Sequence, residues 1–565
     1  MNRTAELLFV IVISIFSFSY AVSDVAATVY YVDASAGNDA RSGQTPDLAW
    51  QSVSKINASR LLPGDQILFR RGQTWRALLN PPASGTQASP IIFGAYGSGN
   101  DPIISGADLV TNWSNHSGNI WKANSSTEPK VVLFDGVYGI NKVDVSQLSA
   151  PNEWVWSGSV LYIYSLSDPS SGFSKPGIEA GARNNALYIS HKNFLVFNAL
   201  NFHIANIYVA FLDNGVEGLT FDGCNFNYGY EYGLVPKSEP AEINVVIRNC
   251  STKYNGSSGI HAGDGSSNWL IQNNTSFRDS YLYGTGELGY GGGIKVWGTA
   301  HDIIIENNTV ILAGKKDDGS DVHKPTHGFG IWLDTAGAGI TIRYNKAYQC
   351  AMNGITVEKT SNAQVYYNLA YNNGSDGISM HGDDKGIVSG NAFYNNVSYA
   401  NGRNGISAWG PYLGVANSCN SNSFKNNIAA ANGQQQFSAK WGCENDQTHG
   451  SGNVYIYNAF GVEAKNFIEW GSLVYKSTYG AYEGAYGSLT YSMTMEPLLV
   501  DPINADFTIK IASPAVNSGE DVGLTRDFAG SSIRNTQKPN IGAFESTESP
   551  LPIPYNLTLI RLEPQ

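Results

Sequence analysis

Two acidic residues occupy the same place in two similar five-residue segments. Asp334 closes GIWLD and Glu358 closes GITVE, 24 residues further along the chain. If these segments are neighbouring strands of one sheet, the carboxylates lie roughly 5 Å apart, because strands are spaced by about 4.7–4.9 Å. A retaining glycosidase needs about 5–5.5 Å between its two carboxyl groups, and an inverting one about 6.5–9.5 Å. The spacing therefore predicts a retaining pair, in which one pKa rises and that group donates a proton.

The segments that carry these acids belong to a series with the pattern Gly-Ile-x-x-x. Side chains alternate along a strand, so the Ile and the fourth residue are expected to point inward, and the third and fifth residues outward. The third-position column is His261, Lys295, Trp332, Thr356, Ser379 and Ser407. The fifth-position column is Gly263, Trp297, Asp334, Glu358, His381 and Trp409.

The two columns form one expected face, rich in aromatic, cationic and acidic side chains. Trp332 shares this face with Asp334, so we expect it to be a platform for a sugar ring. The side chains expected to stack on sugars or to bind their hydroxyl or carboxylate groups are Trp332, Trp297, Trp409, Lys295, His261 and His381. The alternative is that the acids form only ion pairs, with Lys295, Lys359 or Arg343.

A second repeat explains how such strands would be stacked. A seven-residue phrase, such as IENNTVI from Ile305, recurs with a period of about 23 residues plus insertions, which indicates a solenoid. Its fourth position is expected to form a ladder of side chains that bond the coils above and below. The residues at this position are Cys250, Asn274, Asn308, Asn345, Asn368, Asn391 and Asn427.

Together with the opening YYVDASAGND and the closing SPAVNSGEDVG and NIGAFE, these repeats resemble the secreted right-handed parallel β-helix proteins. That group includes polysaccharide lyases, glycoside hydrolases and uronate epimerases. The resemblance implies an all-β fold, a right-handed single-stranded parallel β-helix with an N-terminal capping segment and an inserted β-hairpin region. GIWLD and GITVE are similar to the adjacent coils of β-helix xylan-active glycoside hydrolases. By that resemblance Asp334 would be the nucleophile and Glu358 the acid/base.

The expected organisation follows from composition along the chain. Residues 1–27 are expected to be a signal peptide, because an apolar run from Leu7 to Phe18 is too short to span a bilayer and is followed by small residues. Residues 28–183 are expected to be a cap and early irregular coils with an insertion, and 184–453 regular coils that carry the site. Residues 454–545 would close the solenoid, and 546–565 form a Pro-rich tail.

Three other functional classes are alternatives for the same face. A lyase or epimerase acting on a uronic-acid glycan needs a base and a cation, and Lys359 in EKTSN with His381-Gly382 resembles the motifs of β-helix lyases, without their arginine. Ca²⁺ could then bind Glu358, Asp383 or Asp384. Gly382-Asp383-Asp384 also echoes the inverting pectin hydrolases, whose other motifs are missing. A non-catalytic glycan binder would keep the aromatic groove and need no paired acids.

The net charge and the cysteine spacing limit which partners and metal sites we expect. The net charge is −12 and no long Lys/Arg run occurs, so nucleic acid or an anionic membrane is not the expected partner. We expect a secreted monomer that acts on a poly- or oligosaccharide and has no metal cofactor, Ca²⁺ being the exception for a lyase. The cysteines fit no zinc site; Cys224 and Cys250 should stack as thiols, Cys419 and Cys443 could pair, and Cys350 is left over.

Overall fold

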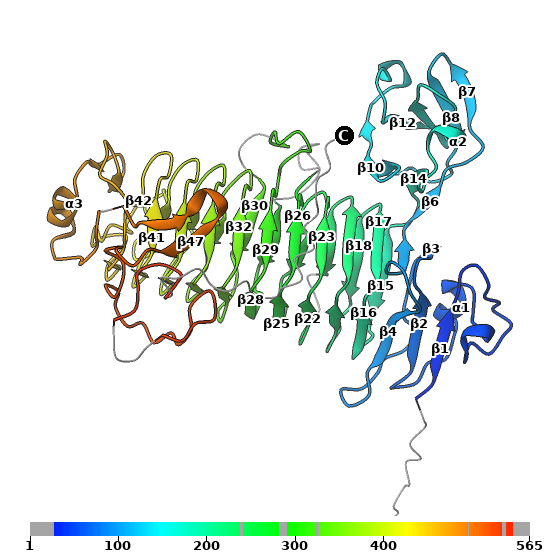
Figure 1. The fold of residues 1–565 in the computed structure, drawn as a ribbon, viewed down its shortest axis with the longest axis horizontal. Coiled ribbons are helices and arrows are strands. Elements are labelled where there is room, and N and C mark those ends of the chain that lie inside the picture. Colours follow the sequence, from blue (N-terminus) through cyan, green and yellow to red (C-terminus); the bar gives the residue numbers. More distant parts are fainter. Residues whose placement is uncertain are drawn as a thin grey trace, which may run out of the picture.

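The computed structural model describes residues 27–237, 241–281, 291–322, 327–494, 496–533 and 538–545. The described chain winds into stacked coils whose strands form three long parallel sheets, here called A, B and C (Figure 1). A regular coil contributes one strand to each sheet in turn. The expected parallel β-helix is therefore confirmed, and the expected signal peptide lies outside the described residues except for Ala27.

Sheet A holds the strands that begin most coils. In spatial order they are β1 (Val29–Val32), β2 (Gln66–Arg70), β4 (Ile91–Tyr96), β16 (Leu195–Asn198), β19 (Thr220–Asp222), β22 (Val246–Arg248), β25 (Ser267–Gln272), β28 (His301–Glu306), β31 (Thr341–Arg343), β34 (Gln364–Tyr366), β37 (Ala392–Tyr394), β40 (Ser423–Lys425) and β43 (Val454–Ile456).

Sheet B follows sheet A around one corner of the coil. Its strands are β3 (Thr74–Arg76), β5 (Ile103–Ser105), β17 (Asn201–Ala205), β20 (Asn225–Gly229), β23 (Ser251–Lys253), β26 (Thr275–Phe277), β29 (Thr309–Ile311), β32 (Lys346–Tyr348), β35 (Leu369–Tyr371), β38 (Val397–Tyr399) and β41 (Ile428–Ala430).

Sheet C carries the Gly-Ile-x-x-x segments. Its strands are β15 (Asn185–Ser190), β18 (Tyr208–Asp213), β21 (Tyr232–Pro236), β24 (Ile260–Ala262), β27 (Gly292–Trp297), β30 (Phe329–Asp334), β33 (Ile355–Glu358), β36 (Ile378–His381), β39 (Ile406–Trp409), β42 (Phe437–Lys440), β44 (Ile468–Trp470) and the antiparallel β45 (Tyr475–Lys476).

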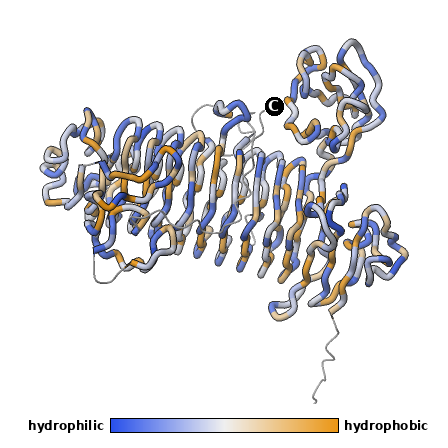
Figure 2. Tube along the Cα trace, in the orientation of Figure 1, coloured by the Kyte–Doolittle hydropathy of each residue, from blue (hydrophilic) through white to orange (hydrophobic). Residues whose placement is uncertain are grey.

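Apolar side chains of the same type stack inside the solenoid. In sheet C, Ile294, Ile331 and Ile355 follow one another in register, and all are fully or almost fully buried. The alternation of apolar and polar residues along the coils is visible as repeated colour changes in Figure 2. This continuous core explains why the pattern of one coil predicts that of the next.

The corner between sheets A and B is closed by hydrogen-bonded asparagines. The Asn345 side chain accepts from the Asn308 backbone N–H (2.9 Å) and donates to the Asn368 side chain (3.0 Å). The Asn368 N–H is bonded by Asn396, not by Asn391. The prediction that Asn391 belongs to this ladder was wrong. Asn391 accepts from the Ala363 N–H and donates to the Asn422 side chain, at a different corner of the coil. The segment VSGN has the same residue pattern as the repeat but lies five residues before the ladder position, Asn396.

The N-terminal coils carry a cap and an insertion. A short helix, α1 (Val53–Asn57), follows β1 near the first coils, with a 3-10 turn, η1 (Pro46–Leu48), before it. Between β5 and β15 the chain leaves the solenoid and builds a separate lobe, drawn in cyan in Figure 1.

That lobe, here called the inserted lobe, consists of two small sheets. One contains β6 (Ala107–Leu109), β14 (Ile178–Gly181), β9 (Val132–Phe134) and β10 (Val137–Tyr138); the other contains β7 (Ser114–Ser117), β8 (Ile120–Asn124), β13 (Val160–Tyr164), β12 (Glu153–Ser157) and β11 (Ile140–Asn141), with η2 (Val145–Gln147) and α2 (Pro169–Gly172) between strands. Strands β12 and β13 pair as the hairpin that the sequence predicts.

The C-terminal part packs against the last coils. It contains α3 (Tyr479–Tyr486) and the hairpin of β46 (Leu499–Asp501), η3 (Pro502–Asn504) and β47 (Asp506–Ile509). Cys419 and Cys443 form a disulfide between the loop that precedes β40 and the loop that follows β42. Cys224, Cys250 and Cys350 are free and buried, and the Cys224 N–H donates to the Cys250 Sγ, as expected for stacked thiols.

Candidate active site

Sheet C positions the predicted residues in the register that the sequence predicts. Asp334 at the end of β30 pairs with Glu358 at the end of β33, and Glu358 pairs with His381 at the end of β36. Trp297 and Trp409 continue this fifth-position column in the two directions. The two acids therefore emerge from consecutive coils, one strand spacing apart.

The third-position column is covered rather than open to solvent. Lys295, Trp332 and Thr356 are 5%, 3% and 0% exposed. Residues of the preceding turns form hydrogen bonds with the third-position column. Asn353 donates to Thr356 Oγ1, and Ser407 donates to the buried carboxylate of Asp376. The expectation of one outward face is correct for the register, but only the fifth-position column approaches solvent.

Asp334 is held by a cation from the preceding coil. Lys295 Nζ lies 2.9 Å from Asp334 Oδ2 and 3.8 Å from the centre of the Trp332 ring. Burial lowers the pKa of Lys295, and the Asp334 carboxylate opposes this change. A carboxylate of this kind is a group that can serve as a nucleophile.

Glu358 has the opposite environment. Its side chain is 11% exposed, and Trp332 Nε1 donates a 3.0 Å hydrogen bond to Oε2. Burial raises the pKa of Glu358 to about 7, and repulsion from Asp334 adds to the rise. A carboxyl group with this pKa holds its proton close to neutral pH and can act as a general acid.

A third carboxylate controls the cation next to Glu358. Lys359 Nζ lies 2.9 Å from Asp383 Oδ2 and 3.5 Å from Glu358 Oε1. Lys359 directly follows β33 and has a φ of 45°, in the left-handed region. His381 Nε2 is 3.9 Å from Glu358 Oε2, and burial lowers the pKa of this imidazole to about 4, so it is neutral beside the acid.

Trp332 does not form the open sugar platform that the sequence suggests. Its ring lies between the Lys295 ammonium and Phe329, whose ring centre is 4.5 Å away, and its indole N–H is bonded to Glu358. With 3% of its surface exposed, the ring has almost no face left for a sugar. Its position indicates that it holds Glu358 in place.

A cavity of about 390 Å³ opens beside Asp334, over the earlier coils of sheet C. Lys295, Trp297, His261 and Gly263 of the two predicted columns line it, together with residues that the sequence did not single out: Tyr208, Phe211, Tyr232, Val235, Pro236 and Lys237. Trp297 is 39% exposed, so part of its ring is open to solvent. The additional residues come from β18, from β21 and from the position directly after β21, and these strands lack the Gly-Ile-x-x-x pattern.

On the other side of Glu358, Trp409 lies in a patch of cations. Lys440 Nζ is 4.1 Å and Arg403 Cζ 4.4 Å from the centre of its ring, and its Nε1 donates to Ser438 Oγ. Tyr412 and Trp441, on the loops joined by the disulfide, stack edge to face nearby. The sheet C face thus continues downstream as a mixed aromatic and cationic surface.

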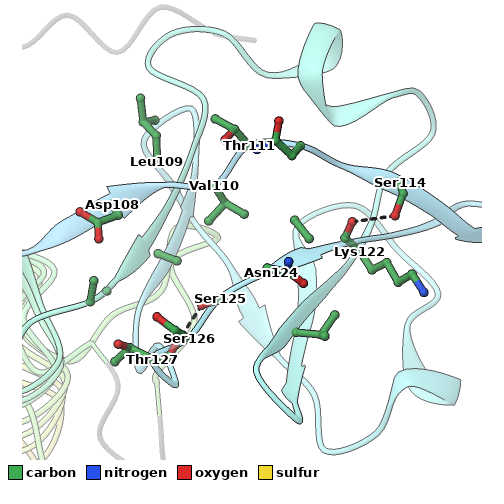
Figure 3. A pocket seen from close by; sticks show the side chains of 16 residues that line it. Asp108, Leu109, Val110, Thr111, Ser114, Lys122, Asn124, Ser125, Ser126 and Thr127 are labelled. Atoms are coloured by element: carbon green, nitrogen blue, oxygen red, sulfur yellow. Dashed lines mark hydrogen bonds between the residues drawn. The ribbon is translucent and has the colours of Figure 1, made fainter.

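A second cavity, of about 420 Å³, lies far from the paired acids, in the inserted lobe (Figure 3). Small polar side chains such as Thr111, Ser114 and Asn124 line it, together with Asp108 and Lys122. Within the described residues, no cluster of three or more potential metal ligands occurs. Among the same described residues, no helix has the length and apolar character that a bilayer crossing requires.

The chain is similar to known proteins in sequence and in fold. Residues 174–310 and 316–467, just over half of the chain, match the family described as the right-handed β-helix region. A lacto-N-biosidase of Bifidobacterium longum subsp. longum is 26% identical over 221 residues, which covers 33% of this chain and 13% of that enzyme. The match therefore spans only about an eighth of that relative's length.

Two solved structures extend the comparison. The complex of XylC with xylose has a TM-score of 0.57 at 13% identity, over 92% of this chain and 98% of its own. A lacto-N-biosidase from Eubacterium ramulus has a TM-score of 0.43 at 16% identity, over 78% of this chain and 68% of its own. At these identities the first likeness is one of fold.

Proposed function

Because this chain belongs to the right-handed β-helix family, we propose that the sheet C face is the active site of an exported carbohydrate-active enzyme, a retaining glycoside hydrolase. The observation that carries the proposal is the contrast between two carboxyl groups in register on consecutive coils. Asp334 is paired with Lys295, while Glu358 is buried, accepts a hydrogen bond from Trp332, and has a pKa that burial raises to about 7.

In the first step the Asp334 carboxylate attacks the anomeric carbon of the sugar. The bond from that carbon to the glycosidic oxygen breaks, and Glu358 gives its proton to the departing oxygen. The products of this step are a sugar ester on Asp334, an ionised Glu358 and the free leaving group.

In the second step Glu358 takes a proton from water, whose oxygen attacks the same carbon and displaces Asp334. The sugar leaves with its original anomeric configuration, and both acids return to their starting states. Neutral His381 and the Lys359–Asp383 pair stay beside Glu358 throughout, so the local charge changes by one unit at most.

Two further observations support this function. The sequence similarity to a lacto-N-biosidase favours hydrolysis of an oligosaccharide over elimination. The disulfide between Cys419 and Cys443 is typical of exported proteins and agrees with the expected signal peptide. Lys359, the residue that a lyase mechanism would use, is engaged by two carboxylates.

The test combines a glycan panel with two readouts. Purified protein is incubated with xylo-oligosaccharides, milk-type oligosaccharides, alginate and pectate, and the products are followed by proton NMR and by the ultraviolet absorbance of unsaturated uronates. We expect reducing sugar that first appears as the anomer of the substrate, with no such absorbance. Unsaturated product, or initial release of the opposite anomer, would contradict the proposal.

Matched variants assign the acids. Asp334→Asn and Glu358→Gln should each lower turnover at least a thousandfold, by analogy with the loss of a nucleophile or an acid/base. Azide should restore activity to Glu358→Ala, because a small anion can replace the activated water, and should not restore Asp334→Ala as a retaining enzyme. Asp302→Asn, on sheet A, is the control and should keep full activity.

A further inference from the structure

The cavity beside Asp334 lies on one side of the paired acids only. Its lining extends from β18 to Asp334 on β30, and Glu358 does not contribute to it. In the proposed mechanism the sugar that forms the ester lies against Asp334, and the departing oxygen lies against Glu358. This argument rests on the proposed function, and it gives the bound glycan a direction along the solenoid.

The far wall of the cavity is aromatic. The ring centres of Tyr208 and Phe211 are 4.9 Å apart, and those of Tyr208 and Tyr232 are 5.7 Å apart. Trp297 stands at the mouth, one coil before Asp334. The volume of about 390 Å³ is near the lower end of the usual range for ligand sites, about 300–1,000 Å³, and suits one or two sugar rings.

The cavity also holds a buried polar atom that has no hydrogen-bond partner among the described residues. His261 is 7% exposed, and within the described residues its Nδ1 has no hydrogen-bond partner. Tyr232 packs edge to face against the imidazole, 5.0 Å between ring centres. Burial lowers the pKa of His261 to about 3, so the ring is neutral, and its free nitrogen suits a sugar hydroxyl.

The charged groups around the cavity cancel in pairs. Lys237 Nζ lies 3.3 Å from Asp213 Oδ1, and Lys295 Nζ lies 2.9 Å from Asp334 Oδ2. A sugar carboxylate entering here would meet two cations that already have anionic partners, and would lose its hydration without a new counter-charge.

We propose that this cavity receives the uncharged non-reducing end of the glycan, so that the enzyme removes one or two neutral sugars from chain ends and rejects terminal uronates. The leaving part of the chain lies over Glu358, His381 and the Trp409 patch. The non-reducing end points toward the N-terminal coils.

Binding of free sugars tests the site without any turnover. Xylose, galactose and N-acetylglucosamine, and glucuronic and galacturonic acids, are titrated into the whole protein and followed by saturation-transfer NMR and tryptophan fluorescence. We expect a neutral sugar to bind at least tenfold more tightly than either acid, and His261→Ala and Trp297→Ala each to weaken it about tenfold. His301→Ala, an exposed imidazole on sheet A, should have no effect. Equal or tighter binding of a uronate, or no effect of both site variants, would overturn the proposal.

Cleavage patterns separate this inference from the proposed function. A neutral oligosaccharide labelled at its reducing end should shorten stepwise by one or two units. Early release of mid-length labelled fragments would refute the end-binding cavity while leaving the hydrolase intact. Binding that depends on His261, with no cleavage of any substrate, would refute the hydrolase and support the cavity as a neutral-sugar site.

Discussion

Burial is the main reason that Glu358 keeps its proton, and three charged neighbours adjust the effect. Burial raises the pKa, Asp334 and Asp383 raise it further, Lys359 lowers it, and the result is a value of about 7. His381 adds no charge near neutral pH. The acid is therefore protonated below about pH 7 and is lost as a proton donor above it.

The first prediction follows from this titration. The value of kcat/KM should begin to fall near pH 7 and should decrease about tenfold for each pH unit above it; this decrease is the alkaline limb. Lys359→Met removes the cation that favours the ionised acid, so the limb should move to higher pH. The measurement is kcat/KM against pH, with Lys122→Met in the inserted lobe as the control. A limb that stays in place, or moves down, would show that Lys359 does not act on Glu358.

In the proposed mechanism the same group links catalysis to stability. Its folded pKa of about 7 lies above the ordinary value of 4.5, so the folded protein binds the proton more tightly than the unfolded chain does. The stabilising contribution is complete below about pH 4.5 and is lost as the pH rises through about 7, at a cost of about 3 kcal/mol.

We therefore predict that Glu358→Gln raises the free energy of unfolding at about pH 8 by about 1–3 kcal/mol and changes it little at about pH 4.5. Urea unfolding at the two pH values measures the difference, and Glu128→Gln at an exposed site serves as the control. A variant that is less stable than the wild type at the higher pH would contradict the assigned burial cost.

At the scale of the coil, each corner asparagine bonds the backbone and side chains of neighbouring coils. Asn345 is fully buried, donates to the Ile305 carbonyl and to Asn368, and accepts from the N–H and the side chain of Asn308. Removing it leaves buried backbone groups unpaired, each at about 1–3 kcal/mol.

Asn345→Ala should accordingly destabilise the protein by about 3 kcal/mol or more. Asn100→Ala, at an exposed turn, is the matched control and should change stability by less than about 0.5 kcal/mol. Thermal and urea unfolding give the comparison, and an equal effect of the two substitutions would show that the ladder contributes nothing special.

The sequence predicted the sheet C register because the Gly-Ile-x-x-x strands keep one side chain per position on every coil, from His261 to Trp409. It did not predict that Trp332 is covered, because the covering groups, Lys295 and Phe329, become neighbours only after folding. The shift from Asn391 to Asn396 was missed because two neighbouring corners both use asparagine.

At the scale of the molecule, the least predictable part is the cavity wall. Tyr208 and Tyr232 lie on early coils without a repeated motif, and their approach to Asp334 depends on the stacking of β18 to β30. In the inserted lobe, by contrast, the sequence predicted the β12–β13 hairpin. It did not predict how the lobe is attached to the solenoid, which includes an ion pair between Arg76 of β3 and Glu179 of β14.

The disulfide joins two loops at the C-terminal end of the sheet C face. Cys419 and Cys443 are 24 residues apart, and closing a loop of this length stabilises a fold by about 3 kcal/mol. Replacing both with alanine should lower the free energy of unfolding by about that amount, and a reductant should affect only the wild type. Cys350→Ala, which removes a buried free thiol, is the control. Equal sensitivity of the wild type and the double alanine variant to the reductant would contradict the prediction.

Stacked coils restrict the distances that one column of side chains can reach. Separations grow only in whole increments of about 4.8 Å, so Asp334 and Glu358 are one increment apart and Asp334 and His381 are two. One increment suits a double displacement, and two increments approach the upper limit of about 9.5 Å for a single displacement by water. In the proposed mechanism, relocating one acid by a single rung would exchange one stereochemical course for the other, so a stacked-coil scaffold can switch reaction outcome in discrete steps while the backbone stays the same.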